Sequence, residues 1–265
     1  MYLNGPMTVR AGLPDRIDEH FPGPRLDPKR WTASYLPAWS SRAESAATYT
    51  IGPDGLRLSI PPEQGLWCAD RHQEPLRVSA VQTGNWSGPA GSTQGQQPFH
   101  DGLTVREPQP TTWGYTPHFG YLEVQLSARI GPASMFSAWM VGIEDQPHRS
   151  GEICLVEVFG KTVDAGRAGI GSGIHPFRDP NLVEEFSAEA RLIDVGERHV
   201  YAVDWRPGRV DFFLDGERYR TVEQAPDYPM QLIIGVFQFP GWATALGAPP
   251  EVPELAVHRI TGWSH

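Results

Sequence analysis

The sequence predicts an all-β protein, a two-sheet antiparallel β-sandwich. Short runs of aliphatic, aromatic and β-branched residues recur along the chain, and turn signals separate them. The 28 glycines and 26 prolines are spread throughout, as many turns between short strands require. Only residues 179–190 have the composition of a helix. Many short strands and almost no helix are typical of a sandwich, and we expect one domain over residues 1–265.

The N-terminal third begins with an irregular segment. Residues 1–30 are rich in proline and charge, and we expect an arm that ends in an edge strand. Strands are predicted at 46–51 and 56–60, joined by a Gly-Pro-Asp-Gly turn at 52–55. Residues 82–102 are rich in Gly, Ser, Gln and Asn. This stretch is too long for a hairpin loop and is predicted to be functional or disordered.

The remaining strands follow from alternation and turn chemistry. In residues 120–129 every second side chain is apolar, which indicates a strand with one buried face. Turn signals such as Asp215-Gly216 separate the later runs. Further strands are predicted at 135–141, 152–157, 198–204, 209–214, 218–222, 230–239 and 254–263.

Composition excludes several classes of partner. The 22 basic and 31 acidic side chains leave a formal charge of −9, which argues against nucleic acid and anionic membranes as partners. No apolar run approaches the ~18 residues of a membrane span. Residues 1–21 lack the apolar segment of a signal peptide, so we expect a cytoplasmic protein, or a secreted one whose signal has been removed. We expect a monomer without a cofactor.

Residues 152–157, Glu-Ile-Cys-Leu-Val-Glu, form the central stretch of the chain. Glu152 and Cys154 lie on one face of a regular strand, but Glu157 would point to the other face. A β-bulge, which adds one residue to a strand, would return Glu157 to the first face. Four regular steps along a strand separate Cα atoms by roughly 13 Å, so the two carboxyls must lean towards each other. Two carboxyls about 5–5.5 Å apart have the spacing that a retaining glycosidase needs. In isolation, the same pattern also suits a solvated strand face.

Several segments resemble family 16 of the glycoside hydrolases, the laminarinase and lichenase group with a concanavalin A-like jelly roll. They are residues 55–58 (Gly-Leu-Arg-Leu), 119–124 (Phe-Gly-Tyr-Leu-Glu-Val), 135–140 (Met-Phe-Ser-Ala-Trp-Met) and the hairpin of 201–216, in the family's order. The family's motif is Glu-x-Asp-x-x-Glu, and here it reads Glu-x-Cys-x-x-Glu. The resemblance implies a retaining endo-glycosidase acting on β-linked polysaccharide, with a β-1,3- or β-1,3-1,4-glucan suggested by the family alone.

The resemblance also implies roles for residues. Glu152 corresponds to the nucleophile and Glu157 to the general acid and base. Cys154 replaces the middle aspartate, and we expect a neutral thiol that donates weakly to Glu152, or a small residue that only fills space. Where relatives often place an aspartate for structural calcium, this chain has Ala256, so no metal is expected.

Aromatic and polar side chains are candidates for binding sugar, because aromatic faces stack on sugar rings. For each candidate the alternative is a structural role. The predicted substrate-binding residues are Trp139, His175, Trp242, Gln238, Trp113 and Trp86.

Other chemistries lack support in the sequence. The nine histidines show no metal-binding spacing, and the glycines at 169, 171 and 173 lack the spacing of a nucleotide loop. The two cysteines, Cys68 and Cys154, are expected to be free thiols. The main alternative to a hydrolase is a carbohydrate-binding jelly roll with weakened catalysis, for which Cys154 is the one positive hint.

Overall fold

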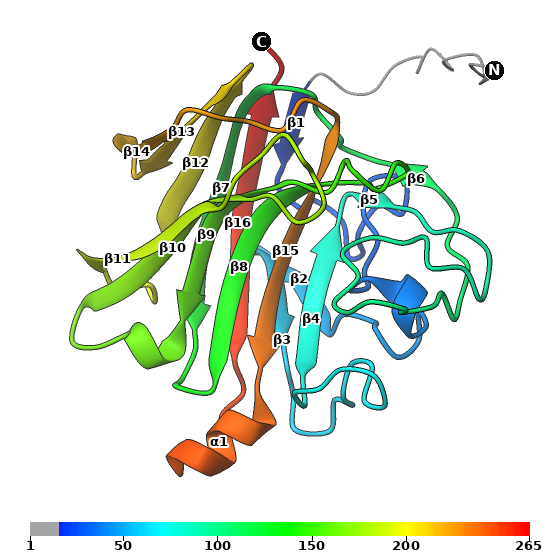
Figure 1. Cartoon of the computed structure of the whole chain (residues 1–265). Coiled ribbons are helices and arrows are strands. Elements are labelled where there is room, and N and C mark those ends of the chain that lie inside the picture. The colour runs from blue at the N-terminus through cyan, green and yellow to red at the C-terminus, as the bar shows by residue number, and fades with distance from the viewer. Residues whose placement is uncertain (1–15) are drawn as a thin grey trace, which may run out of the picture.

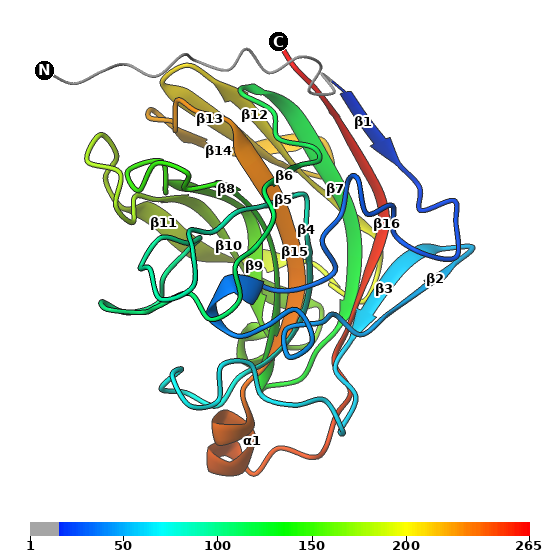
Figure 2. The same cartoon turned by 90° about the vertical axis from the view of Figure 1, so that its right-hand side faces the viewer.

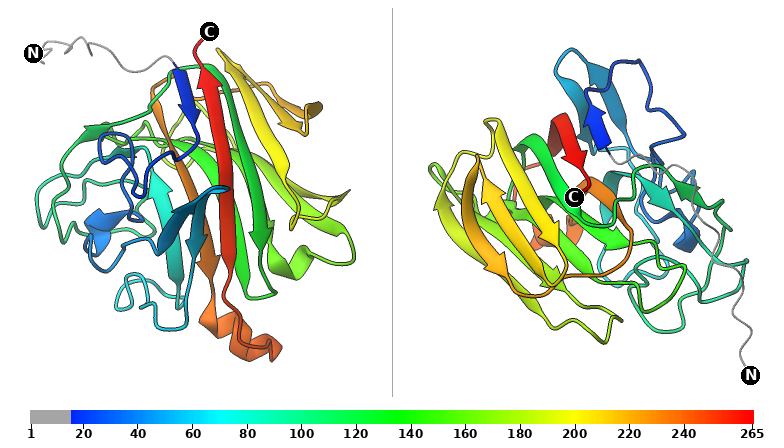
Figure 3. Two further views of the ribbon diagram at one scale, coloured as in Figure 1. Left: turned by 180° about the vertical axis from the view of Figure 1, so that it is seen from behind. Right: turned by 90° about the horizontal axis from the view of Figure 1, so that it is seen from above.

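The computed structural model describes residues 16–265. Two large antiparallel sheets stack as a sandwich (Figure 1), so the predicted fold class is confirmed. The first half of the predicted N-terminal arm lies outside the described residues. Its second half contains an edge strand, β1, that pairs with the C-terminal half of β16 (Figure 3, left).

The larger sheet has the strand order β14-β13-β12-β7-β16-β3-β2, with β1 added beside β16. Its strands are β1 (Arg16–Glu19), β2 (Tyr49–Gly52), β3 (Gly55–Ser59), β7 (Gly120–Arg129), β12 (His199–Arg206), β13 (Arg209–Leu214), β14 (Glu217–Val222) and β16 (Glu254–Trp263).

The smaller sheet has the order β11-β10-β9-β8-β15-β4. Its strands are β4 (Arg77–Gln82), β8 (Ser134–Gly142), β9 (Glu152–Phe159), β10 (Arg167–His175), β11 (Glu185–Leu192) and β15 (Met230–Gln238). The remaining elements are short: β5 (Gly84–Asn85) and β6 (Thr112–Trp113), which pair with each other, the 3₁₀ turns η1 (Pro37–Trp39) and η2 (Gly160–Thr162), and the helix α1 (Pro240–Leu246).

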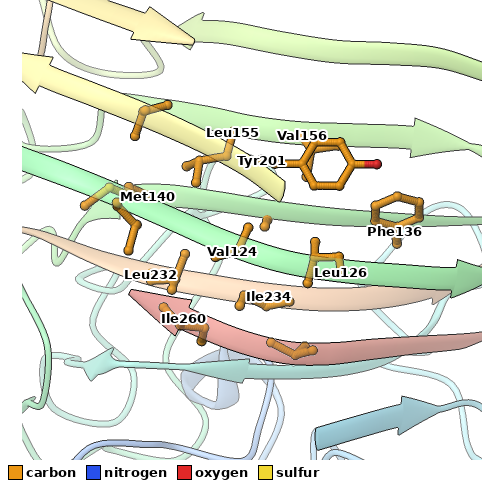
Figure 4. Packing of buried hydrophobic residues seen from close by; sticks show 14 of the residues in the cluster. Val124, Leu126, Phe136, Met140, Leu155, Val156, Tyr201, Leu232, Ile234 and Ile260 are labelled. Carbon is orange, nitrogen blue, oxygen red and sulfur yellow. The ribbon is translucent and has the colours of Figure 1, made fainter. Parts of the chain in front are cut away.

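The hydrophobic core lies between the two sheets. Every second residue of β7 from Leu122 to Ala128 is buried, as the alternation predicted. Figure 4 shows side chains from both sheets interdigitating, among them Leu126 of β7, Phe136 of β8 and Ile260 of β16. Burial of these apolar surfaces is the main free-energy term that holds the layers together.

The outer face of the six-stranded sheet carries a second apolar cluster. Loops from residues 20–48 and 86–111 gather beside β4 and β15, on the side of the sheet away from β11 (Figure 1), and Figure 2 views the molecule from this side. They are joined to each other, since the Trp39 indole N–H donates to the Gln96 carbonyl at 2.7 Å. These loops therefore cover one half of the outer face and border the site described below.

Two predictions of local structure were wrong. Residues 179–190 do not form a helix, because residues 185–192 pair along their whole length with β10 as the edge strand β11. The exposed face of an edge strand carries polar residues, and these hid the strand pattern. The helix α1, at Pro240–Leu246, was not predicted. No helix within residues 16–265 is long and apolar enough to cross a membrane.

Candidate active site

Strand β9 contains the β-bulge that the sequence predicted. On β8, Ala138 pairs with Val156, and the next residue, Trp139, pairs with Cys154. Leu155 is therefore the extra residue, and the pairing with β10 shows the same shift. Bulges commonly re-aim side chains beside active sites.

The bulge sorts the side chains of β9 between two environments. Leu155 and Val156 both belong to the core between the sheets, although they are neighbours in sequence (Figure 4). Glu152 and Glu157 instead line one pocket on the outer face of the six-stranded sheet, and Cys154 packs in the apolar cluster of that face. The predicted row of three side chains is present.

This pocket, hereafter the cleft, has a volume of about 340 Å³. Strands β8, β9, β10 and β15 form its floor, and loop residues complete its walls. Its lining residues are Tyr35, Gln97, Met135, Ser137, Trp139, Glu152, Glu157, His175, Phe177 and Phe237. The mixture of aromatic faces and a few convergent polar groups suits a sugar ligand.

Glycines on β10 make room beside the acids. A Cβ atom at Gly171 would approach the Phe186 ring to 2.6 Å, and Gly173 has a φ of +139°. Because these positions carry no side chain, Phe186 of β11 lies across β10 and stacks on His175 with ring centroids 4.5 Å apart. The glycine run of the sequence thus shapes the cleft.

Burial governs the electrostatics of the two acids. It raises the pKa of Glu152 to about 8, and the charge of Glu157 adds to the rise. Burial also raises the pKa of Glu157, whereas the nearby His175 lowers it. Two coupled carboxyls in one pocket can retain a proton near neutral pH, which general acid catalysis requires.

Cys154 is 1% exposed, lies between the two acids in sequence, and is close enough for the charges of both to act on it. Burial raises the pKa of its thiol well above the usual value, and the charges of Glu152 and Glu157 raise it further. Hydrogen bonding with the Ser137 side chain offsets only part of this rise. A pKa raised in this direction keeps the thiol in its neutral form at physiological pH. Both cysteines are free thiols.

The predicted substrate-binding residues fall into two groups. Trp139 and His175 line the cleft with the acids. Trp242 lies on α1, stacked on Phe239 with centroids 4.2 Å apart and with the Lys161 ammonium 4.5 Å from its ring. Trp242 does not line the cleft.

The other three candidates also lie away from the acids. Gln238 is on the opposite face of β15 from Phe237, where its side chain bonds Arg77 and the Glu251 carbonyl. Trp113 is part of the short β5–β6 ladder, and Trp86 directly follows β5. Neither Trp113 nor Trp86 lines the cleft.

The cleft also contains residues that sequence reasoning missed. Tyr35, Gln97, Phe177 and Phe237 all line it. Gln97 lies in the long loop that was predicted to be functional, which is the one signal that could have found it. Within residues 16–265, no group of three or more His, Cys, Asp or Glu side chains is placed to hold a metal ion.

A two-sheet sandwich with a carboxyl pair in an aromatic cleft has the groups that glycoside hydrolysis requires. The family model of glycosyl hydrolases family 16 matches residues 112–251, more than half of the chain, and the chain belongs to this family. Membership supports glycoside hydrolase activity. No curated protein sequence matches the chain.

Several solved structures of glycan-cleaving enzymes are similar to this chain. A GlcNAcα1-4Gal releasing endo-β-galactosidase from Clostridium perfringens is 25% identical, with a TM-score of 0.79. The match covers 93% of this chain but 61% of that structure, so this chain spans about three fifths of its length. A non-specific endo-β-1,3(4)-glucanase of family 16 is 18% identical, with 96% and 93% coverage and a TM-score of 0.62. The Bacillus licheniformis β-glucanase is 15% identical, with 94% and 98% coverage and a TM-score of 0.58. These two glucanases support the fold alone.

Proposed function

We propose that the protein is a retaining, endo-acting glycoside hydrolase, with Glu152 as nucleophile and Glu157 as general acid and base. The observation that carries this proposal is the bulge of β9, which brings both carboxyls to one cleft. Family membership supports the reaction class. The motif Glu-x-Cys-x-x-Glu supports the assignment of the two roles, because both reacting carboxyls of the family's motif are present.

The reaction proceeds in two steps. In the first, the Glu152 carboxylate attacks the anomeric carbon while the Glu157 carboxyl gives its proton to the departing glycosidic oxygen. A glycosyl ester forms on Glu152 and the leaving sugar carries the proton away. In the second, the Glu157 carboxylate takes a proton from water, the water oxygen attacks the anomeric carbon, and Glu152 is released. Two inversions leave the configuration retained.

The structural similarity of this chain to known enzymes suggests which type of glycosidic linkage to test first. The TM-score of 0.79 to an endo-β-galactosidase exceeds the 0.62 and 0.58 of the two glucanases. We therefore propose β-galactosidic linkages within larger glycans as the substrate class to test ahead of the β-1,3- and β-1,3-1,4-glucans. The aromatic walls of the cleft, such as Trp139 and Phe237, provide stacking surfaces for either sugar.

The test is product analysis on a panel of glycans. GlcNAcα1-4Gal-capped oligosaccharides, galactan, agarose, carrageenan, laminarin, lichenan and xyloglucan are incubated with wild-type protein, Glu152→Gln and Glu157→Gln. An exposed-site variant, Glu63→Gln, controls for the loss of one charge. Glu152→Gln should abolish turnover of the cleaved glycan, and azide should restore activity of Glu157→Gln on substrates with good leaving groups.

Two results would contradict the proposal. Near-normal turnover by a folded Glu152→Gln protein would show that Glu152 is not the nucleophile. Measurable binding of a glycan without products from any member of the panel would favour the carbohydrate-binding alternative.

A further inference from the structure

The side chain of Gln97 links the proposed nucleophile to the tryptophan of the cleft. Its amide nitrogen Nε2 donates to Oε2 of Glu152 at 3.0 Å. Its amide oxygen Oε1 accepts from the indole Nε1 of Trp139 at 3.3 Å. An indole N–H is only a donor, so the amide oxygen must face Trp139. The NH₂ group is then left facing Glu152.

The backbone of Gln97 is held in an unusual conformation. Its φ is +42°, in the left-handed region that side-chain-bearing residues rarely adopt. The Gln97 N–H donates to Oε1 of Glu144, whose carboxylate is buried and also pairs with the Arg178 guanidinium. The Arg178 backbone N–H in turn donates to Ser150 at 2.8 Å. The buried Glu144 carboxyl, paired with the partly exposed Arg178 guanidinium, thus anchors Gln97 in the conformation that points its amide into the cleft.

The residues before Gln97 are equally constrained. A Cβ atom at Gly95 would lie 2.6 Å from the Trp39 ring, so the chain passes directly over this tryptophan. The Gln96 carbonyl accepts from the Trp39 indole, and Oε1 of Gln96 accepts from the Trp86 backbone N–H at 3.2 Å. These contacts fix the loop and thereby hold Gln97 in position.

We propose that Gln97 is a positioning residue that orients Glu152 for attack and favours its ionised form, and that Trp139 fixes the orientation of the Gln97 amide. The proposal rests on the proposed function, in which Glu152 must be a carboxylate. Hydrogen-bond donation to a carboxylate stabilises its charged form. Donation to Oε2 also leaves the other carboxylate oxygen available for attack.

The surroundings of Glu152 make this donor necessary. Burial and the charges of Glu157, Glu184 and Glu144 all raise the pKa of Glu152, whereas the Gln97 hydrogen bond lowers it. The remaining titratable groups that face this region are Cys154 on its own strand, His175 on β10 and Tyr35 from the covering loop.

The test replaces Gln97 with methionine, which keeps the length of the side chain and removes the amide. Gln94→Met makes the same change at an exposed position of the same loop and serves as the matched control. The Glu152 carboxyl is titrated by ¹³C NMR in each variant and is assigned by its absence in Glu152→Gln. This readout needs no turnover, so it remains decisive if the proposed hydrolase activity fails.

Gln97→Met should raise the pKa of Glu152 by about one unit, roughly the effect of one hydrogen bond to a charged group. Where a substrate is cleaved, the acid limb of the kcat/KM profile should move to higher pH by the same amount. The Gln94→Met titration should match wild type. A Glu152 titration that Gln97→Met leaves unmoved would overturn the proposal.

The role of Trp139 is tested by a double-mutant cycle. Trp139→Phe removes the indole N–H and retains an aromatic ring, so the amide of Gln97 is free to turn. In the wild-type background this change should raise the pKa of Glu152, by less than Gln97→Met does. In the Gln97→Met background it should have no further effect. Equal shifts in both backgrounds would show that Trp139 acts independently of Gln97. If Gln97→Met does not fold, Trp139→Phe alone is the second variant: a pKa of Glu152 that it leaves unmoved would then overturn the proposal.

Discussion

Replacing Glu152 by glutamine should stabilise the folded protein while it abolishes catalysis. The Glu152 carboxyl is buried, and its pKa is raised to about 8 from 4.5, first by burial and then by Glu157. Glutamine has nearly the same shape, has no charge to bury, and can still accept the hydrogen bond from Gln97. The variant therefore removes the electrostatic cost and leaves the packing in place.

The sign of the pH dependence follows from linkage. A carboxyl with a raised pKa in the folded state binds its proton more tightly there than in the unfolded chain. The stability that it contributes is complete below about pH 4.5 and is lost as the pH rises towards 8. The change from 4.5 to 8 corresponds to at most about 5 kcal/mol. We expect about 2–5 kcal/mol, because water in the open cleft screens part of the cost.

Chemical denaturation between pH 4 and 9 measures this effect. The free energy of unfolding of Glu152→Gln should equal that of wild type near pH 4. It should then exceed it by up to about 1.4 kcal/mol per pH unit. Glu63→Gln, which removes an exposed carboxyl, is the control. A difference that is constant across this range, or a Glu152→Gln protein that is less stable at pH 8, would refute the reasoning.

Three further predictions concern the surroundings of the acids. Cys154→Asp should retain turnover and displace the pH–rate profile, because a third carboxyl joins the coupled titration, whereas Cys154→Ala should raise the barrier by only about 1–2 kcal/mol. Arg178→Met should lower the free energy of unfolding by about 1 kcal/mol, since the buried Glu144 carboxyl loses a partner that solvent partly screens, and adding Glu144→Gln should restore most of this loss. Phe177→Ala should raise KM with little change in kcat, because this ring is 56% exposed at the cleft wall. Steady-state kinetics and denaturation check these outcomes, and an Arg178→Met protein as stable as wild type would contradict the second.

Strands with one buried face could be predicted from the sequence. The predicted bounds 120–129 and 254–263 agree with β7 and β16, because alternation and flanking turns mark both ends. Strand β11 could not be recognised, since its place depends on pairing with β10 and none of its residues is fully buried. The helix α1 did leave a signal, with Pro240 at its first position and Gly247 at its end in a left-handed conformation.

The carboxyl pair on the floor of the cleft could be predicted from the sequence, whereas the loop residues of its walls could not. Two glutamates five positions apart on a β-prone run require a bulge if both are to serve one cleft, and β9 has that bulge. Gln97 reaches Glu152 from 55 residues away in the chain, out of a loop with no periodicity. Contacts of this kind depend on tertiary packing, which no local pattern records. For the same reason Trp242, next to a strand of the cleft in sequence, lies outside the cleft.

The central claim is that Glu152 attacks the anomeric carbon and that Glu157 supplies the proton. Trapping the glycosyl-enzyme tests it most directly. Glu157→Gln is mixed with an activated glycoside of the cleaved sugar, quenched in acid, digested and examined by mass spectrometry. We predict one sugar ester on the peptide that contains Glu152, and none in the variant that also carries Glu152→Gln. A sugar attached to Cys154, or an ester that persists without Glu152, would contradict the account.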